Sequence, residues 1–270
     1  MTLSSDLLAK VQQFEWYHTL ELAPGVVTPG WFDTRELPPR LPFPNSLKGK
    51  RCLDIGTFDG FWAFEMERRG AAEVVAIDLL NIEEIDWPPN TQPQTVDALR
   101  RRKRDGQGFE LAKECLRSSV IRHDLSVYDL DEQKLGQFDF VYFGSLLLHL
   151  RDPVRALESV RRVSRGEVLI VDTIDLLLTI LFPHRPTASI DVRGRPWWWI
   201  CNSAGIVRLV EAALFRVAEH PRRIFIPPGT GQPLRPLRPQ MVFTRSGRDG
   251  LLKRLLGDAH VVIRAVPTNG

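Results

Sequence analysis

A glycine-rich segment with two aspartates, LDIGTFDGF at 53–61, is the part of the sequence best suited to binding a ligand. Its glycines, Gly56 and Gly60, allow the backbone to approach a ligand closely, and Asp54 precedes them. The apolar run EVVAID ends in Asp78, whose carboxylate can accept hydrogen bonds from both hydroxyls of a ribose. The segment therefore predicts a site for a cofactor that contains a nucleoside.

The spacing of these residues separates two kinds of cofactor. A dinucleotide site typically has G-x-G-x-x-G, whose third glycine lets the helix pack against the strand and whose loop holds a pyrophosphate. Here the pattern is D-x-G-x-x-x-G, and an acid beside the loop repels phosphate but attracts a sulfonium or an amine. The spacing favours S-adenosylmethionine over NAD. The alternative is an ordinary strand-turn-helix corner, and the combined spacing of both glycines and both acids argues against it.

Strands and helices alternate around this segment in a way that would bring its residues to one edge of a sheet. Short apolar runs predict strands buried on both faces, and stretches with helical periodicity lie between them. Such alternation indicates a parallel sheet, and ligands bind outside the carboxyl ends of its strands. The predicted strands are 51–55, 74–77, 120–123, 138–143 and 168–171, and the predicted helices are 61–69, 154–163 and 203–214.

Residues 51–78 resemble motif I and the following acidic strand end of class I S-adenosylmethionine-dependent methyltransferases. SVYDL, FDFVYFGSLLLHLRDP and RGEVLIVDT resemble the third to fifth strands of that fold, in order. WYHTLEL, the RRGA turn, LLLHLRDP and PWWWICNSAGIVRLVEAALF are similar to a bacterial group related to the tRNA wobble-uridine carboxymethyltransferases. The resemblance implies an α/β fold with a doubly wound, mostly parallel seven-stranded sheet, the Rossmann-like methyltransferase fold, and an inserted helical lid.

One methyltransferase domain with additions at both ends is the expected organisation. Residues 1–48 would form an N-terminal helix and a proline-rich lead-in that cover the site, and residues 49–246 the methyltransferase domain. The long connection at about 80–118 would form a lid. RRIFI and MVFTR, the latter at 241–245, would be the antiparallel final strands that the resemblance implies, and 247–270 would be a C-terminal tail.

The cofactor is expected to contact residues at the carboxyl ends of four strands. Near the third strand end, Asp124 and Ser126 compete for the contact with the adenine amino group that the resemblance implies. The predicted cofactor-binding residues are Asp54, Gly56, Thr57, Phe58, Gly60, Phe61, Asp78, Leu79, Ser126, Val127, Gly144 and Ser145.

Methyl transfer from a sulfonium mainly requires that the acceptor and the methyl carbon are held in line. If the acceptor is a hydroxyl, a side chain with a pKa near neutrality helps to remove its proton. His149, which follows the fourth strand, is the predicted catalytic residue, and capping of the helix that starts near Asp152 is its alternative role. Asp172 and Asp175, after the fifth strand, are the other candidates.

Substrate contacts are expected from the lead-in and from a tryptophan-rich segment. His18 would close over the site, and its alternative role is that of a packed aromatic anchor. Three successive tryptophans at 197–199 cannot all face one way, so at least one is exposed or lines a cavity. The predicted substrate-binding residues are His18, Trp197, Trp199 and Asn202.

Composition limits the cellular locations and the binding partners that the sequence predicts for this protein. The chain has 270 residues and a net charge of +3, which suits one full core and does not demand nucleic acid. The basic run at 100–104 could contact phosphates, but a solvated helix face is the favoured alternative. No apolar run is long enough to span a membrane, the three cysteines are far apart, and the six histidines lack metal-ligand spacing. A cytoplasmic protein without metal or membrane contact is expected.

The predicted function is transfer of a methyl group from S-adenosylmethionine to an oxygen or nitrogen of a small molecule. A tRNA-modifying methyltransferase or carboxymethyltransferase is one alternative, and tRNA is the less favoured partner. Leu148 and Leu150 stand where those carboxymethyltransferases have a tyrosine and an arginine, so the resemblance implies ordinary S-adenosylmethionine. A non-catalytic S-adenosylmethionine-binding protein is the other alternative. The sequence leaves the oligomeric state open.

Overall fold

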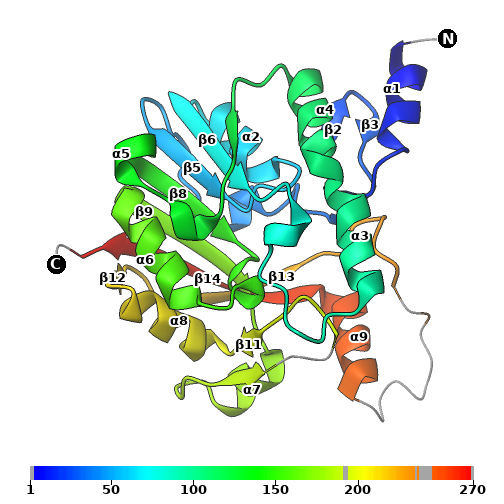
Figure 1. Ribbon diagram of the computed structural model, residues 1–270. Helices are drawn as coiled ribbons and strands as arrows, with labels where there is room; N and C mark the ends of the chain where they lie inside the picture. Colours follow the sequence, from blue (N-terminus) through cyan, green and yellow to red (C-terminus); the bar gives the residue numbers. More distant parts are fainter. Residues whose placement is uncertain (1–2, 191–193, 235, 237–244, 269–270) are drawn as a thin grey trace.

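A mixed sheet forms the centre of the fold (Figure 1), which a computed structural model describes for residues 3–190, 194–234, 236 and 245–268. The strand order is β12-β14-β9-β8-β5-β6-β7, with β13 also paired to β14. β5 to β9 run parallel, whereas β14 is antiparallel to β9, β12 and β13. The strands are β5 (Arg51–Ile55), β6 (Glu73–Asp78), β7 (Ile121–Asp124), β8 (Phe138–Gly144), β9 (Ser164–Thr173), β12 (Phe215–Val217), β13 (Arg222–Ile226) and β14 (Asp258–Pro267).

Both faces of the sheet are buried, which explains why its central strands are continuously apolar. Side chains alternate along β5: Cys52 packs with α2 and α4, whereas Leu53 and Ile55 pack with α6 and α8. The predicted doubly wound α/β fold is therefore confirmed. The helices are α1 (Leu3–Val11), α2 (Phe61–Arg68), α3 (Pro93–Lys103), α4 (Gln107–Leu116), α5 (Glu132–Leu135), α6 (Pro153–Val163), α7 (Leu176–Leu181), α8 (Ser203–Ala212) and α9 (Arg245–Leu256).

The C-terminal part of the chain was predicted wrongly. Residues 247–270 are not a tail, because α9 leads into β14, which inserts between β9 and β12. RRIFI forms β13 as expected, but its antiparallel partner is β14. Of the predicted strand at 241–245, residues 241–244 lie outside the described residues and Arg245 begins α9. Among the described residues the sheet thus has eight strands, seven of them in one hydrogen-bonded path.

The predicted lid at 80–118 divides into two different elements. α3 contributes no buried residue and lies on the outside of the fold. α4, in contrast, places Phe109 and Ala112 in the core with no exposed surface. Only the part up to α3 is peripheral, since α4 is one of the helices that cover the sheet.

Short strands organise the N-terminal lead-in. β1 (Trp16–His18) pairs in parallel with β4 (Gly30–Phe32), and β2 (Glu21–Ala23) pairs with β3 (Val26–Val27). Trp16, Leu20 and Leu37 of this region are buried in the same cluster as α2 and α4. The lead-in is therefore part of the main core.

Candidate cofactor-binding and active site

The glycine loop between β5 and α2 is held by a buried carboxylate. Asp54 is 1% exposed, and its Oδ2 accepts hydrogen bonds from Thr57 Oγ1 at 2.6 Å and from the Ala63 backbone N–H at 3.1 Å. Burial raises the pKa of Asp54 to about 7. Both side-chain contacts are internal, so Asp54 and Thr57 shape the loop from within.

Two glycines give the loop its course. Gly60, at φ 89°, begins α2, and a Cβ there would lie 2.5 Å from the ring of Phe64. Gly56, at φ 73°, is different, because a Cβ there would meet only Leu146, at 3.5 Å. Both positions need the left-handed backbone that glycine tolerates. The space beside Gly56 lies between the loop and the segment that follows β8.

Asp78, the predicted ribose ligand, is engaged by two groups of the protein. Its Oδ2 accepts a hydrogen bond from the Phe58 N–H at 3.2 Å, and its Oδ1 lies 2.5 Å from Lys103 Nζ. The same ammonium donates to the Leu79 carbonyl at 2.8 Å. The Lys103 and Asp78 side chains are only 9% and 13% exposed. A ligand that binds both oxygens of Asp78 would therefore compete with Lys103 for one of them.

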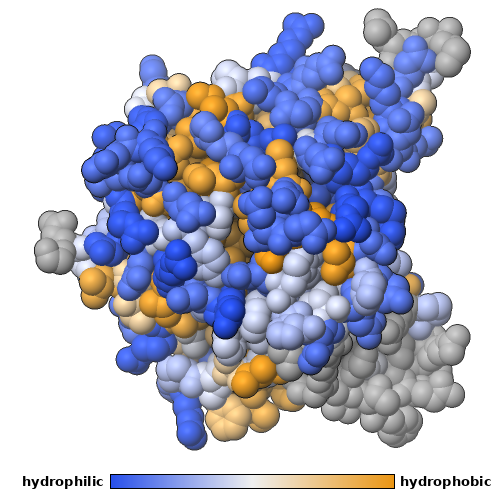
Figure 2. Space-filling model, viewed as in Figure 1, coloured by the Kyte–Doolittle hydropathy of each residue, from blue (hydrophilic) through white to orange (hydrophobic). Residues whose placement is uncertain are grey.

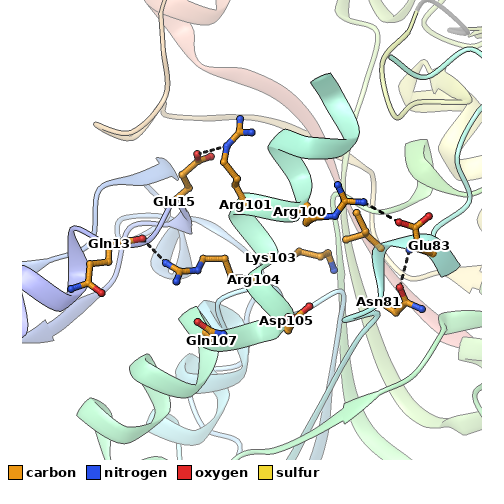
Figure 3. Close-up of a pocket in the computed structure, with 11 residues that line it drawn as sticks. Gln13, Glu15, Asn81, Glu83, Arg100, Arg101, Lys103, Arg104, Asp105 and Gln107 are labelled. Carbon is orange, nitrogen blue, oxygen red and sulfur yellow. Dashed lines mark hydrogen bonds and ion pairs between the residues drawn. The ribbon is translucent and has the colours of Figure 1, made fainter. Parts of the chain in front are cut away.

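A groove of about 530 Å³ opens beside this ion pair, with Lys103 in its wall (Figure 3). Glu15 and Glu83 lie on opposite sides of α3 in Figure 3, and each pairs with an arginine of that helix, Arg101 and Arg100 respectively. The groove is lined by Gln13, Glu15, Asn81, Ile82, Glu83, Arg100, Arg101, Lys103, Arg104, Asp105 and Gln107. Movement of Lys103 away from Asp78 would change this wall of the groove.

The lead-in is fixed directly to the glycine loop. The Oδ2 of Asp59 accepts hydrogen bonds from the backbone N–H groups of Tyr17, at 2.5 Å, and His18, at 2.9 Å. The Tyr17 ring stacks on Phe58, with 4.7 Å between centroids. Phe58 itself has φ 50°, an uncommon conformation for a residue with a side chain. The loop and the lead-in thus form one unit.

His18 is buried in this unit, 5% exposed, and stacks on Phe61 with 5.8 Å between ring centroids. Its Nδ1 is buried without a hydrogen-bond partner among the described residues. These contacts match the alternative role of a packed aromatic anchor. The predicted substrate contact of His18 stays a prediction.

The burial of His18 predicts a loss of stability in acid. Desolvation lowers its pKa to about 3, below that of the unfolded chain, so the unfolded state binds the proton more readily. The contribution of neutral His18 to the free energy of unfolding is fully present above the unfolded pKa of about 6.5. As the pH drops below that value the contribution decreases, and at pH 5 it is about 2 kcal/mol smaller. Between pH 8 and pH 5, we therefore expect the unfolding free energy of His18→Phe to decrease by about 2 kcal/mol less than that of the wild type. Urea unfolding of both proteins at the two pH values measures it, and equal losses would contradict the assignment.

A polar cluster lies at the carboxyl ends of β8 and β9. The Oδ2 of Asp172 accepts hydrogen bonds from the Leu146 and Leu147 N–H groups at 2.8 and 2.9 Å, and its Oδ1 accepts one from Thr173 N–H at 2.8 Å. Burial raises the pKa of Asp172 to about 7. The carboxylate thereby fixes the segment that carries Ser145 and His149.

Ser145 connects this cluster to the lead-in. Its φ is 51°, and its Oγ lies 3.1 Å from Nε2 of His260 at the start of β14. His260 Nδ1 donates to the Asp258 carbonyl at 2.9 Å, which leaves Nε2 as the acceptor. The Tyr17 side chain also lies close enough to Ser145 to interact with it. Tyr17, Ser145 and His260 thus form a connected set at this edge of the sheet.

His149 does not cap α6, because Asp152 does so by accepting the Arg155 N–H at 3.0 Å. Its Nδ1 lies 2.6 Å from the Pro196 carbonyl, which can only accept, so Nδ1 carries the proton and Nε2 the lone pair. Burial is the main cause that lowers the pKa of His149 to about 4, and the positive charge of Lys103 contributes to this shift. The imidazole is therefore neutral at pH 7 and close enough to Lys103 to feel its charge.

The tryptophan segment rests against the turn that carries His149. Trp198 N–H donates to the Leu148 carbonyl at 2.9 Å, and Trp199 Nε1 donates to the Leu150 carbonyl at 3.0 Å. Trp197 is half-buried, with the Arg195 guanidinium 4.1 Å from its ring centroid. The substrate contacts of Trp197 and Trp199 stay predictions.

Asn202 was predicted wrongly as a substrate ligand. Its side chain is fully buried. The amide oxygen accepts N–H groups of Gly205 and Thr187, and the amide nitrogen donates to the carbonyls of Phe182 and Arg185. All of its polar capacity serves to cap α8 and to hold the preceding segment.

The remaining predicted cofactor residues lie at the expected strand ends, where their side chains contact other parts of the protein. Ser126 Oγ accepts the Tyr128 N–H at 3.3 Å, and Val127 is buried in the core. Asp124 accepts the Leu80 N–H at 2.9 Å. A Cβ at Gly144 would lie 2.5 Å from the Tyr142 ring, so glycine is required there. A contact from Val127 would have to come from the backbone, whereas the Ser126 hydroxyl can still donate its proton.

Four residues of the site were not singled out from the sequence for these roles: Tyr17, Asp59, Lys103 and His260. Asp59 lies inside LDIGTFDGF, and Lys103 lies in the basic run, so both had a local signal. His260 lay in the supposed tail, where the apolar run VVI that follows it was the available sign of a strand. Its position beside Ser145 depends on the insertion of β14 next to β9.

The chain belongs to the methyltransferase domain family, whose sequence model matches residues 33–218. It is 27% identical over 240 residues to the secondary metabolism regulator laeA of Coprinopsis cinerea, covering 79% of this chain and 52% of the relative. It is 29% identical over 150 residues to the tRNA U34 carboxymethyltransferase of Campylobacter hominis, covering 53% of this chain and 44% of the relative. The chain thus matches about half the length of these curated relatives.

Solved structures share the fold. The N-terminal domain of EvdMO1, crystallised with S-adenosylhomocysteine and D-fucose, matches with a TM-score of 0.52 and 16% identity, covering 100% of this chain and 98% of that chain. At that identity the likeness establishes the fold alone. No helix in the described part of the chain is both long and apolar enough to cross a membrane.

Proposed function

We propose that this chain is an S-adenosylmethionine-dependent methyltransferase that acts on an oxygen or nitrogen of a small molecule. One observation carries the proposal. The loop after β5, whose Gly56 and Gly60 have left-handed backbone conformations, lies beside Asp78 at the end of the neighbouring strand β6, within a fold of the methyltransferase family. The cofactor-binding residues proposed for it are those predicted from the sequence. The EvdMO1 domain, which shares the fold, was crystallised with S-adenosylhomocysteine.

The residues present fit this cofactor. Asp78 offers two carboxylate oxygens at the end of β6, and the space at Gly56 is the kind of cradle that a Cβ would fill. Asp78 gives this edge a carboxylate beside the loop, which suits a sulfonium better than a phosphate. When bound, S-adenosylmethionine supplies an electrophilic methyl group. The chain has to hold it beside the acceptor and exclude water.

His149 is the proposed acceptor-side residue. Because Nδ1 donates to Pro196, the Nε2 lone pair is fixed in direction and can accept a hydrogen bond from an acceptor hydroxyl or amine. With a pKa lowered to about 4 it is a weak base, so it would orient the acceptor and take a proton only as the new bond forms. Ser145 and His260, which are hydrogen-bonded to one another, offer further polar groups at the same edge of the sheet.

Assays of methyl transfer test this proposal. Purified protein with methyl-labelled S-adenosylmethionine should label members of a panel of small hydroxyl and amine compounds, and His149→Gln should lower the rate without weakening cofactor binding. Binding of the cofactor with no labelled product from any acceptor would instead support a non-catalytic cofactor-binding protein. Absence of both binding and transfer would overturn the proposal.

Modification of tRNA is a second candidate, favoured by the similarity to the tRNA U34 carboxymethyltransferase. The structure lends it less support, because the cations of the basic run have partners within the chain. Arg100 pairs with Asp97 and Glu83, Arg101 with Glu15, and Lys103 with Asp78. Salt-sensitive binding of tRNA would revive this candidate. The departures at Leu148 and Leu150 favour ordinary S-adenosylmethionine over its carboxylated derivative in either case.

Removal of Lys103 should strengthen cofactor binding. The ribose hydroxyls would compete with the ammonium for Asp78, and most of this ion pair is shielded from water. We expect Lys103→Met to lower the Kd for S-adenosylhomocysteine about tenfold, which corresponds to about 1.4 kcal/mol. Arg101→Met, on the same helix but paired with Glu15, is the matched control and should leave the Kd unchanged. Weaker binding by Lys103→Met would show that Lys103 contacts the cofactor instead.

A further inference from the structure

A protruding apolar segment follows β9 and has no role in the site described above. Residues 180–186, with the sequence ILFPHRP, are all exposed. Figure 2 shows apolar surface at the lower edge of the molecule, where Figure 1 places α7. Five large apolar side chains of α7 and its continuation are at least 40% exposed: Leu177, Ile180, Leu181, Phe182 and Ile190.

A second apolar segment, at the end of α9, lies at the same edge of the sheet, where β14 begins. α9 ends one residue before β14 and exposes Leu252, Leu255 and Leu256 by 41%, 65% and 51%. The chain after β9 and the start of β14 meet there, since the Ile174 N–H donates to the Ala259 carbonyl at 3.0 Å. Figure 1 shows α7 and α9 at the same end of the molecule. The exposed side chains therefore belong to the edge that also carries Ser145 and His260.

The charge of the described residues around these side chains is positive. Residues 176–190 contain the exposed Arg185 and no acid, and the end of α9 carries Lys253 and Arg254. Lys253 pairs with Asp258 at 2.9 Å, so these four charged residues leave a surplus of two positive charges. The exposed apolar side chains thus lie beside a positively charged surface.

We propose that α7, its continuation to Ile190 and the end of α9 form a docking face for the surface of an anionic lipid bilayer. Leucine, isoleucine and phenylalanine side chains would enter the boundary between headgroups and acyl chains, and the surrounding cations would meet the lipid phosphates. A helix as short as α7 suits this shallow contact, which requires no membrane-spanning segment. The proposal goes beyond the proposed methyl transfer and does not depend on it.

Charge favours a bilayer over a second copy of the chain. Two copies that met through this face would bring like charges together, which opposes association. An anionic surface instead complements the positive charge, and a bilayer accepts a narrow apolar projection.

Sedimentation with vesicles tests the docking face. We expect the full chain to sediment with phosphatidylcholine vesicles that contain phosphatidylglycerol, less with phosphatidylcholine alone, and less at 0.5 M than at 0.05 M salt. Ile180→Ser combined with Leu181→Ser should lower the bound fraction about tenfold, and Arg185→Glu should lower it on anionic vesicles only. Leu214→Ser, a similarly exposed leucine at the opposite edge of the sheet, is the matched control and should have no effect.

Other results would overturn the proposal. Lack of sedimentation by the wild type, or equal binding by the double variant and the control, would do so. If light scattering showed a dimer that the same substitutions dissociate, a second copy would be the occupant. Calorimetry with S-adenosylhomocysteine on each variant separates this outcome from the proposed function, because the docking substitutions should leave cofactor affinity unchanged.

Discussion

Asp78→Ala is expected to weaken binding of S-adenosylhomocysteine about 100-fold. The carboxylate would provide two charge-assisted hydrogen bonds to the ribose, and their loss corresponds to about 3 kcal/mol. Asp78 lies at the end of β6, beside the glycine loop, and is held by the Phe58 N–H on one oxygen and Lys103 on the other. Calorimetric titration of the two proteins measures the difference.

Two further variants make this result specific. Asp131→Ala removes an acid that caps α5 on the amino side of β8, and it should leave the affinity unchanged. In a chain that already carries Lys103→Met, Asp78→Ala should weaken binding of S-adenosylhomocysteine by a larger factor than in the wild type, because the competing ammonium is absent. An affinity that Asp78→Ala leaves within twofold of wild type would remove Asp78 from the site.

Asp172→Ala is expected to lower the free energy of unfolding by about 4 kcal/mol. The side chain has no exposed surface and accepts the N–H groups of Leu146, Leu147 and Thr173. Alanine would leave these donors without a partner, at a cost of about 1–3 kcal/mol for each fully buried group. Urea unfolding at pH 8, where the carboxyl is largely ionised, measures the loss.

Asp172→Asn is the matched control for this effect. The amide retains one oxygen, which can still accept the Leu146 and Leu147 N–H groups, and loses the acceptor for Thr173. We expect it to lose less than half as much stability as alanine does. If both substitutions changed stability by under 1 kcal/mol, Asp172 would not be what fixes the segment carrying Ser145 and His149.

The local parts of the site could be predicted from the sequence. β5, the glycine turn and α2 are set by neighbouring residues, and the buried strands β6 and β8 have unmistakable apolar runs. Parallel strands place their carboxyl ends together, so the edge that carries Asp54, Asp78 and His149 also followed.

Contacts between distant segments could not be predicted. Lys103 reaches Asp78 only because α3 lies across the end of β6, and the sequence does not reveal that placement. Asn202 looked available as a polar side chain beside the tryptophans, yet the segment from Phe182 to Thr187 folds around it and uses its whole amide. The tail was misjudged because β14 is held by pairing with β9 and β12, which are distant in the sequence.

Hydrogen exchange of the wild-type protein with and without saturating S-adenosylhomocysteine tests the central claim most directly, since it reports binding and its location together. A cofactor site at the carboxyl edge predicts slower exchange in the segments 54–61, 78–81, 124–128 and 144–148. The amino ends of the same strands should be unaffected. No protection at millimolar ligand, or protection confined to another part of the chain, would contradict the assignment of this edge as the cofactor site.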